Sequence, residues 1–261
     1  MPYFDHKGAS LYYEETGRGR PLLFLHGASW DMRQWQRQVA RFAPQYRVIT
    51  LDARGHGRSS LPPGAVAPDI FWQDAAALLD HLQLPPAVLC GLSLGGHTAL
   101  QVAIHAGARV AGLVLIGTPC TNCFNLYERM VLPVNRFCLR LMPMRAIAWS
   151  IAAGMGRFSP EVKPYIRDVV GRMDHDAFNR LWKAATSMES RDGLASVSCP
   201  ALLLIGDHDS MTRRQQPYLH AQIPGSRLVV IENAHHGTNF DNPEQVEAEI
   251  ERFLAELEAR A

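Results

Sequence analysis

Ser93 lies in a segment whose residue types and spacing suit nucleophilic catalysis. It is the central residue of Gly91-Leu92-Ser93-Leu94-Gly95, which fits the pattern G-x-S-x-G. A serine hydroxyl becomes a nucleophile when it stands clear of the backbone with a base beside it. A sharp turn from strand to helix achieves this but crowds the positions two residues before and after the serine, where glycine fits because it has no Cβ. The pattern therefore predicts a nucleophilic serine on a tight turn.

The same five residues also suit a glycine-rich turn without a chemical function, because the chain contains 20 glycines and such a pattern can arise by chance. The flanking elements distinguish the two interpretations. The apolar residues 88–90 predict a buried strand before the turn, and a helix is expected to follow as far as about residue 105. The first N–H groups of that helix would point at the reaction centre, where an oxyanion forms.

Further polar motifs come directly after apolar runs, which are typical of strands buried on both faces. They are His26-Gly27 after residues 22–25, Asp52 to Ser59 after residues 47–51, Gly206 to Asp209 after residues 201–205, and His235-His236 after residues 227–231. Strands that alternate with helices predict a mostly parallel sheet with helices on both faces. Because ligands of such sheets bind beyond the carboxyl ends of the strands, we expect these motifs to converge on one edge.

The rest of the chain predicts an N-terminal hairpin, another buried strand, three further helices and one irregular stretch. The hairpin is expected over residues 4–15, the strand over 110–116, and the helices over 32–42, 69–82 and 243–258. Strand-like runs disappear between residues 120 and 191. Prolines and glycines such as Pro133 are expected to break this stretch into several short helices.

Length, charge and cysteine usage limit the class of protein. A chain of 261 residues suits one domain with a modest insertion, and a net charge of +1 gives no basis for binding nucleic acid. The N-terminus does not read as a signal peptide, and no apolar run reaches the roughly 18 residues of a membrane span. Five scattered cysteines fit reduced thiols. We therefore expect a cytoplasmic protein without stable membrane insertion, whose oligomeric state no feature specifies.

Cys120 and Cys123 form a C-x-x-C pair, a spacing found in zinc and redox sites. A zinc or redox module would lose its function on chelation or thiol alkylation. No second pair of cysteines and no spaced pair of histidines accompanies this one. We therefore expect neither a metal nor any other cofactor.

In their order along the chain, the motifs resemble those of the α/β-hydrolase superfamily, and the resemblance covers nearly the whole sequence. The four that carry it are His26-Gly27, the Asp52 to Ser59 motif, the serine turn, and Gly206-x-x-Asp209 with a late histidine. The resemblance implies an α/β-hydrolase fold, a mostly parallel sheet flanked by helices with an inserted helical cap. Residues 1–119 and 192–261 would form the core, and residues 120–191 the cap.

The resemblance also implies a catalytic triad, in the chain order Ser93, Asp209 and His236. Ser93 would be the nucleophile. The family's Gly-x-x-Asp pattern selects Asp209 as the acid over Asp207, which we expect to be a loop residue facing solvent. His236 is favoured over His235 as the base because a Pro-Glu pair stands seven residues after it, as in the family. His235 then occupies the position where the family usually has glycine.

Two backbone N–H groups would bind the oxyanion, those of Ala28 and Leu94. Only the backbone matters at these positions, so apolar side chains are compatible with the role. Three other histidines are interpreted as structural. His26 would organise its loop through hydrogen bonds, His56 would stabilise a turn, and His97 would be packed in the helix after the serine.

Substrate choice in this fold lies mainly with the cap and the mouth of the pocket. The candidate wall residues are Trp30, Phe124, Trp149, Trp182 and Met211, and packing of the cap on the core is the alternative role for each. Residues 126–154 are apolar with arginines at positions 129, 136, 140 and 145. These arginines fit an anionic substrate, a membrane surface or a solvated helix face.

The activity that the resemblance implies is hydrolysis of a carboxylic ester of a small to medium apolar substrate through an acyl-enzyme. A lactonase, a thioesterase and a carbon–carbon bond hydrolase would use the same triad. The alternative from another class is a ligand receptor built on the same fold, with little or no turnover. The expected partner is in each case a small molecule.

Overall fold

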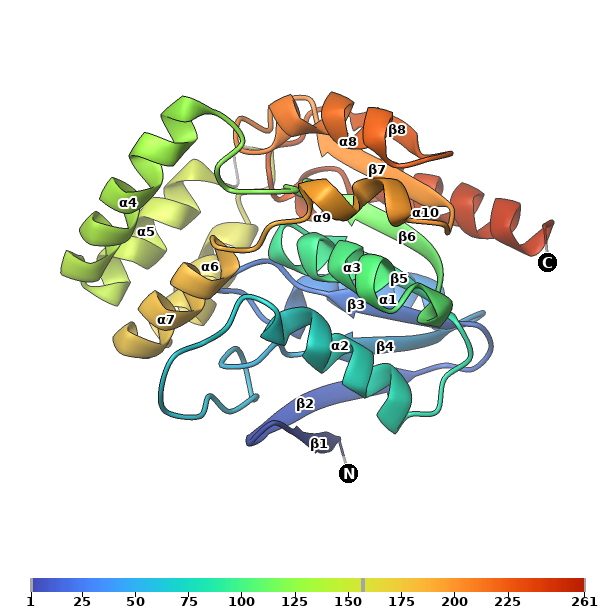
Figure 1. The fold of residues 1–261 in the computed structure, drawn as a ribbon, viewed down its shortest axis with the longest axis horizontal. Helices are drawn as coiled ribbons and strands as arrows, with labels where there is room; N and C mark the ends of the chain where they lie inside the picture. The colour runs from blue at the N-terminus through green and yellow to red at the C-terminus, as the bar shows by residue number, and fades with distance from the viewer. Residues whose placement is uncertain (1, 156–157, 261) are drawn as a thin grey trace.

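The computed structural model describes residues 2–155 and 158–260, which build an eight-stranded sheet with helices on both faces (Figure 1). The strands are β1 (Tyr3–His6), β2 (Ala9–Thr16), β3 (Pro21–Leu25), β4 (Arg47–Leu51), β5 (Ala87–Leu92), β6 (Val110–Ile116), β7 (Ala201–Gly206) and β8 (Arg227–Ile231). Their order in the sheet is β1-β2-β4-β3-β5-β6-β7-β8. β2 runs antiparallel to both of its neighbours, and β3 to β8 are parallel. The predicted α/β-hydrolase fold class is confirmed.

Helices and short 3-10 turns connect these strands. The α-helices are α1 (Gln36–Phe42), α2 (Ile70–His81), α3 (Leu94–His105), α4 (Leu126–Leu141), α5 (Met144–Gly154), α6 (Val162–Gly171), α7 (His175–Ala185), α8 (Gln216–Gln222), α9 (Thr238–Asp241) and α10 (Pro243–Glu258). The 3-10 turns are η1 (Met32–Trp35), η2 (Gly107–Arg109), η3 (Arg191–Ser196) and η4 (Arg213–Gln215). The predicted strands over 47–51, 110–116 and 227–231 and the helix over 243–258 have the expected bounds.

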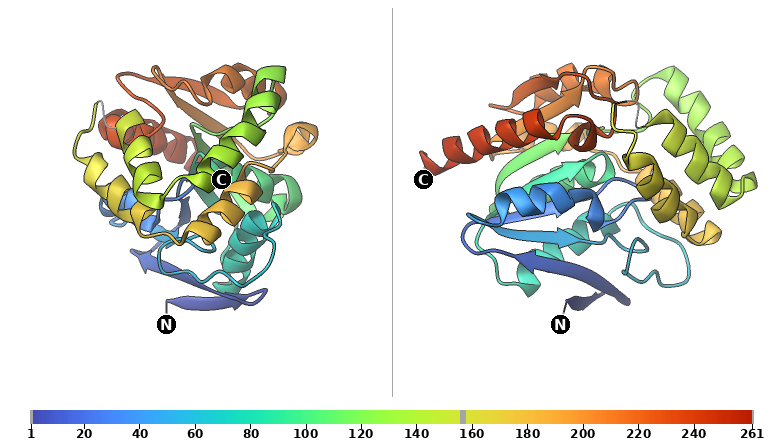
Figure 2. Two further views of the ribbon diagram at one scale, coloured as in Figure 1. Left: turned by 90° about the vertical axis from the view of Figure 1, so that its left-hand side faces the viewer. Right: turned by 180° about the vertical axis from the view of Figure 1, so that it is seen from behind.

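Helices form a layer on each face of the sheet (Figure 2). Each face buries an apolar cluster against its layer. Leu22 and Phe24 of β3 belong to the cluster that includes residues of α1 and α10. Leu23 and Leu25 belong to the opposite cluster, with residues of α2, α3 and α8. Successive side chains of a strand point to opposite faces, so a strand covered on both sides must be apolar throughout.

Two predicted elements differ from the structure at identifiable residues. The expected helix over 32–42 begins as η1, where the carboxylate of Asp31 accepts the N–H of Arg33 at 3.0 Å and so caps the turn. The helix break expected at Pro133 is absent, and α4 continues through this residue. Proline removes one helical hydrogen bond, but Pro133 and Arg129 are both exposed, so water can satisfy the released carbonyl.

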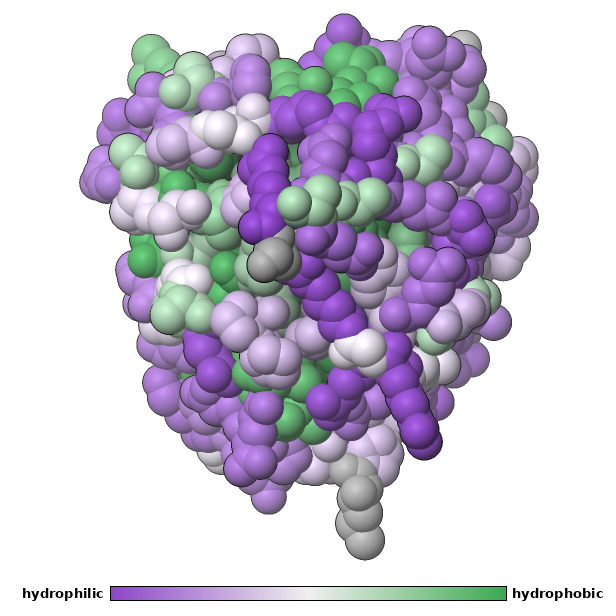
Figure 3. All heavy atoms as spheres, turned by 90° about the vertical axis from the view of Figure 1, so that its right-hand side faces the viewer, coloured by the Kyte–Doolittle hydropathy of each residue, from purple (hydrophilic) through white to green (hydrophobic). Residues whose placement is uncertain are grey.

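The helices between β6 and β7, α4 to α7, gather at one end of the molecule, on the left in Figure 1, away from the C-terminus. Figure 3 shows the opposite end, where hydrophilic residues cover most of the surface and apolar residues appear in separate patches. Across residues 2–155 and 158–260, none of the helices is both long and apolar enough to cross a membrane.

The first turn of α3 lies directly against the ends of β3 and β5, with no side chain between the backbones. A Cβ on Gly95 would overlap the carbonyl of Leu25 and lie 2.7 Å from the carbonyl oxygen of His26. A Cβ on Gly91 would overlap the backbone of Gly95. Glycine is therefore required at both positions, for the reason that the sequence pattern predicts.

Replacing Gly95 with alanine is expected to lower the free energy of unfolding by about 3 kcal/mol, the upper end for overpacking, because the atoms it meets are backbone. Gly107→Ala is the matched control, since a Cβ there would meet nothing within 4 Å. Its effect should stay within about 0.5 kcal/mol. Urea denaturation of the wild type and both variants measures the two losses of unfolding free energy. Equal losses would contradict the close approach of α3 to β3 and β5.

Candidate active site

Ser93 occupies the turn between β5 and α3 in a strained backbone conformation. Its φ is 54° and its ψ is −112°. A non-glycine residue held with positive φ costs of order 1–3 kcal/mol, so the surrounding structure must impose it. The Ser93 N–H donates to the carbonyl of Ile116 at 2.9 Å, which ties the turn to the end of β6. The side chain is partly exposed, whereas Leu94 after it is buried.

Asp209 and His236 form a buried pair on the loops that follow β7 and β8. His236 Nδ1 lies 2.8 Å from Asp209 Oδ2, and the two residues are 6% and 1% exposed. Asp209 Oδ1 also accepts the N–H groups of Met211 at 2.7 Å and Thr212 at 3.0 Å. The hydroxyl of Thr212 donates to Oδ2 at 2.9 Å. These bonds fix the carboxylate, which in turn orients the imidazole.

The electrostatics of the pair keep Asp209 ionised. Burial alone raises the pKa of its carboxyl, but the charge of His236 and the hydrogen bonds from His236 and Thr212 outweigh burial and lower the pKa to about 2. With Nδ1 of His236 bonded to this carboxylate, Nε2 is the ring nitrogen left to exchange a proton. A carboxylate at Nδ1 also stabilises the imidazolium that such an exchange creates.

Asp207 has a different role from the one expected from the sequence. It is partly buried rather than facing solvent, and its Oδ1 accepts the N–H of Ala234 at 2.9 Å. Asp241 Oδ2 accepts the N–H of His235 at 2.8 Å. These two carboxylates therefore bind consecutive N–H groups of the loop that carries His236. The ring of His235 packs beside that of His208, with 5.6 Å between centroids.

Ser93 and the Asp209–His236 pair both lie against the backbone at the end of β6. Gly117 follows Ile116, the residue that accepts the Ser93 N–H. A Cβ on Gly117 would lie 3.1 Å from Asp209 Oδ2 and 3.2 Å from His236 Nδ1. The three residues therefore follow the carboxyl ends of β5, β7 and β8, and all lie next to the backbone segment Ile116–Gly117 at the end of β6.

The loop after β3 presents the second candidate N–H group for an oxyanion. Gly27 N–H donates to Gln34 Oε1 at 2.8 Å, and Ser29 N–H donates to His56 Nε2 at 3.1 Å. Among the residues that the structure describes, the N–H of Ala28 between them has no hydrogen-bond partner. The N–H of Leu94 is the first of α3 and has no partner within the helix.

Three buried histidines have the structural positions that the sequence predicts. His26 Nε2 accepts the N–H of Ala53 at 2.9 Å, and His56 Nε2 accepts that of Ser29. His97 Nε2 lies 2.8 Å from Ser190 Oγ. Burial lowers the pKa of all three, to about 4 for His56 and His97. The neutral rings can therefore accept hydrogen bonds at neutral pH.

Apolar and aromatic side chains of α6 and α7 pack against residues of the serine turn and of the loop after β3. Leu94 packs in a buried cluster with Leu181 of α7, and Ala28 contacts the same cluster. Trp30 lies edge-on to Tyr165 of α6 and to Phe240, with centroids 6.3 Å and 5.7 Å away. Leu181, Tyr165 and Phe240 carry no motif of their own in the sequence, so only the fold identifies them.

The five candidate wall residues are dispersed. Trp30 is buried near His236, since it lies 3.8 Å from where a Cβ on the adjacent Gly237 would be, and Met211 is half exposed beside Asp209. Phe124 packs edge-on against Tyr218. Trp182 stacks on Phe178 and donates to Asn135. Trp149 is 61% exposed, with the guanidinium of Arg167 over its ring.

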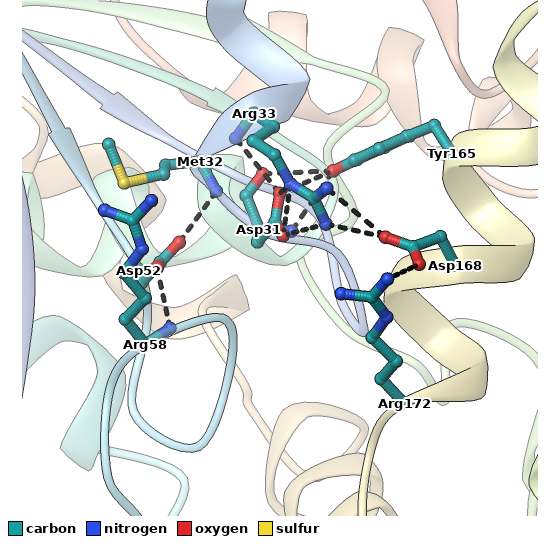
Figure 4. A network of polar contacts seen from close by, with 8 residues as sticks. All are labelled: Asp31, Met32, Arg33, Asp52, Arg58, Tyr165, Asp168 and Arg172. Carbon is teal, nitrogen blue, oxygen red and sulfur yellow. Dashed lines mark hydrogen bonds and ion pairs between the residues drawn. The ribbon is translucent and has the colours of Figure 1, made fainter.

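Asp31 lies at the centre of a polar network that joins the loop after β3 to α6 (Figure 4). Its N–H donates to the Tyr165 hydroxyl at 3.2 Å, and its carboxylate accepts Arg33 Nε at 2.9 Å. Arg33 also pairs with Asp168 of α6 at 3.2 Å, and Arg172 pairs with the other oxygen of Asp168 at 2.6 Å. The network connects α6 to the loop that carries the candidate oxyanion N–H.

A cleft of about 970 Å³ lies beside this network, but the candidate catalytic side chains do not line it. Its arginines are engaged with neighbouring acids, as in the Asp31 network and in the pairing of Arg58 with Glu14 at 3.2 Å. Ser93, Asp209 and His236 lie elsewhere. The size of this cleft therefore does not identify the candidate site, which the strained turn and the buried pair mark instead.

The C-x-x-C pair lacks the features of a reactive site. All five cysteines are free, and Cys120 is buried with its thiol 3.3 Å from Gln215 Oε1. Burial raises the pKa of Cys120 to about 12, which disfavours the thiolate that zinc binding and thiol exchange require. Within residues 2–155 and 158–260, no group of three or more potential ligand side chains is arranged to hold a metal ion.

Comparison with known proteins relates this arrangement to characterised families. The sequence model of the "Alpha/beta hydrolase family" matches residues 22–249. The chain is 31% identical to 3-oxoadipate enol-lactonase 2 of Acinetobacter baylyi, over 97% of this chain and 100% of that protein.

Two solved structures show the same likeness in three dimensions. An enol-lactonase from Burkholderia xenovorans LB400 superposes with a TM-score of 0.89 at 26% identity, over 97% of this chain and 100% of the other. A thermophilic esterase from Thermogutta terrifontis, in a malate-bound structure, superposes with a TM-score of 0.87 at 28% identity, over 98% and 97% of the two chains.

The lowered pKa of Asp209 predicts a specific dependence of stability on pH. The pKa is about 2 in the folded protein and about 3.9 for an unfolded aspartate, so its contribution is present above pH ~4 and is lost as the pH falls towards ~2. Between these pH values, the free energy of unfolding of the wild type should fall by about 2 kcal/mol more than that of Asp209→Asn.

Urea unfolding at a series of pH values from about 5 downward measures this difference. Asp192→Asn, at an exposed position in η3, is the control and should follow the wild type. Parallel curves for the wild type and Asp209→Asn would show that His236 and Thr212 do not stabilise the carboxylate.

Proposed function

This chain belongs to the alpha/beta hydrolase family, and we propose that it is a serine hydrolase that cleaves carboxylic esters of small to medium apolar molecules. The observation that carries the proposal is the buried hydrogen bond between Asp209 and His236, held beside the strained turn of Ser93. A nucleophile, a base and an acid that orients the base are the components of acyl transfer through a covalent intermediate.

In the proposed acylation step, Ser93 Oγ attacks the ester carbonyl carbon while His236 Nε2 accepts the hydroxyl proton. The electron pair of the C=O bond moves to oxygen, and the N–H groups of Ala28 and Leu94 bind the resulting oxyanion. The intermediate then expels the alcohol, which takes the proton from His236, and an acyl-serine remains. Each oxyanion donor in such a site contributes about 2.7–4 kcal/mol to transition-state stabilisation.

In the proposed deacylation step, water takes the place of the alcohol. His236 accepts a proton from water as its oxygen attacks the acyl carbon, and the oxyanion forms again against the same two N–H groups. Collapse breaks the bond to Ser93 Oγ, which recovers its proton from His236, and the carboxylic acid leaves. Asp209 remains ionised throughout and stabilises the charged imidazole.

We also propose that residues 120–191 act as a cap over a core formed by residues 1–119 and 192–261. Two contacts support this division. Leu181 of α7 packs with Leu94 beside the serine, and Met155 lies 3.9 Å from where a Cβ on Gly237 would be, next to the base. Apolar side chains above the turn would exclude water and suit an apolar acyl group.

A lactone is the second candidate substrate, because the comparisons favour it specifically. The curated relative at 31% identity and a structure with a TM-score of 0.89 are both named as enol-lactonases. A lactone is an internal ester, so the same proposed steps open its ring, and the alcohol and acid remain in one molecule.

Ser93→Ala is expected to reduce hydrolysis of nitrophenyl esters roughly 10⁴-fold or more, because no other group replaces the nucleophile. Ser150→Ala, at an exposed serine of α5, is the matched control and should retain wild-type activity. Nitrophenyl esters of increasing acyl length, assayed beside simple lactones, measure the turnover of both substrate classes. Equal turnover by the wild type and Ser93→Ala would refute the mechanism.

Activity is expected to fall on the acid side of the pH–rate profile, because a protonated His236 cannot accept the proton of Ser93. Asp209 does not account for this loss, since its pKa of about 2 keeps it ionised. The profile of kcat/KM, measured with an ester for which chemistry limits the rate, tests the assignment. A profile that shows no loss of activity on the acid side would exclude His236 as the base.

A further inference from the structure

The outer face of α4 exposes a continuous set of large apolar side chains. No residue of this helix is buried. The exposed fractions are 71% for Leu126, 66% for Tyr127, 66% for Met130, 59% for Val134, 63% for Phe137 and 69% for Leu141. Isolated exposed apolar residues are common on soluble proteins, but so many on one helix mark an interaction surface.

These six residues lie on one side of the helix. At 100° per residue they fall within an arc of about 100°, and a helix of 16 residues is about 24 Å long. The inward side carries Leu139, which packs on the core cluster, and Arg136, which donates to Thr186 at 2.9 Å. The apolar side therefore faces away from the protein along the whole helix.

The unpaired charges within residues 126–154, which include this face, are of one sign. Residues 126–154 contain four arginines and one glutamate. Arg129 and Arg140 are exposed and lie about 60° and 40° beyond one edge of the apolar arc at 100° per residue, and Arg145 is exposed at the start of α5. The glutamate, Glu128, is engaged inside the protein, where it accepts Phe124 N–H at 2.7 Å and pairs with Arg214 at 2.8 Å.

We propose that the outer face of α4 docks on an anionic lipid bilayer. An apolar stripe with aromatic residues, bordered by arginines, is the arrangement of helices that lie in the plane of the membrane interface. The apolar side chains would enter the boundary between headgroups and acyl chains, and Arg129 and Arg140 would contact lipid phosphates. The positive charge of these arginines complements the negative charge of an anionic bilayer, which is why we propose this occupant.

A second copy of the chain suits the same face poorly. Pairing α4 with α4 would bury the apolar stripes but bring arginines together, and no free carboxylate of the helix would compensate for them. Like charges held close together oppose such pairing. Docking on lipid would also leave the polar end of the molecule shown in Figure 3 in water and bring the proposed cap against the membrane.

Sedimentation with vesicles tests the proposal. We expect the wild type to bind vesicles of equal parts phosphatidylglycerol and phosphatidylcholine, and to bind phosphatidylcholine vesicles much more weakly. Met130→Ser with Phe137→Ser should weaken binding about tenfold or more through lost apolar burial. Arg129→Gln with Arg140→Gln should weaken binding to the anionic vesicles only, as should raising the salt concentration to about 0.5 M.

Val230→Ser is the matched control, since Val230 is 45% exposed on β8, away from α4. It should bind as the wild type does, and circular dichroism checks that all variants fold. Absence of binding to anionic vesicles, or binding that the α4 variants leave unchanged, would overturn the proposal. The proposal would also be overturned if the wild type failed to bind lipid and instead formed a dimer. Light scattering would detect this dimer, and Met130→Ser with Phe137→Ser would dissociate it.

Discussion

The close approach of the α3 backbone to the ends of β3 and β5 is the constraint on which the candidate site depends. Gly91 and Gly95 permit this approach because any Cβ there would overlap backbone atoms. The same approach compresses the connection between β5 and α3 into a turn that holds Ser93 at positive φ. It also brings the first N–H of α3 close to the loop after β3, so one packing contact positions the serine and both candidate oxyanion donors.

The proposed acid and base, Asp209 and His236, depend on a second set of constraints, made by carboxylates. Asp209 holds the imidazole of His236 directly, and Asp207, two residues earlier, holds the loop that carries this histidine. Both carboxylates lie on the loop that follows β7. This loop therefore fixes the position of His236, which follows the neighbouring strand β8. Such support confines the ring to one orientation, as acid–base chemistry requires.

The helices between β6 and β7 contact the rest of the chain through two kinds of interaction. The Asp31 network joins α6 to the loop after β3 by hydrogen bonds and ion pairs, and Leu181 joins α7 to the serine turn by apolar packing. Neither contact involves α4, whose outer face remains without a partner in the described chain. These helices thus combine an inner surface facing the candidate site with an outer surface free for another interaction.

The sequence by itself determined the strands, the serine turn and the order of the polar motifs. Buried parallel strands must be apolar on both faces, and close backbone contacts require glycine, so both features are visible in local sequence. Only the tertiary structure decided which distant residues meet: Tyr165 with Asp31, Asp207 with Ala234, and Leu181 with Leu94. It also decided that α4 continues through Pro133 with its apolar side exposed. Such outcomes depend on packing between segments far apart in the chain, which no local pattern records.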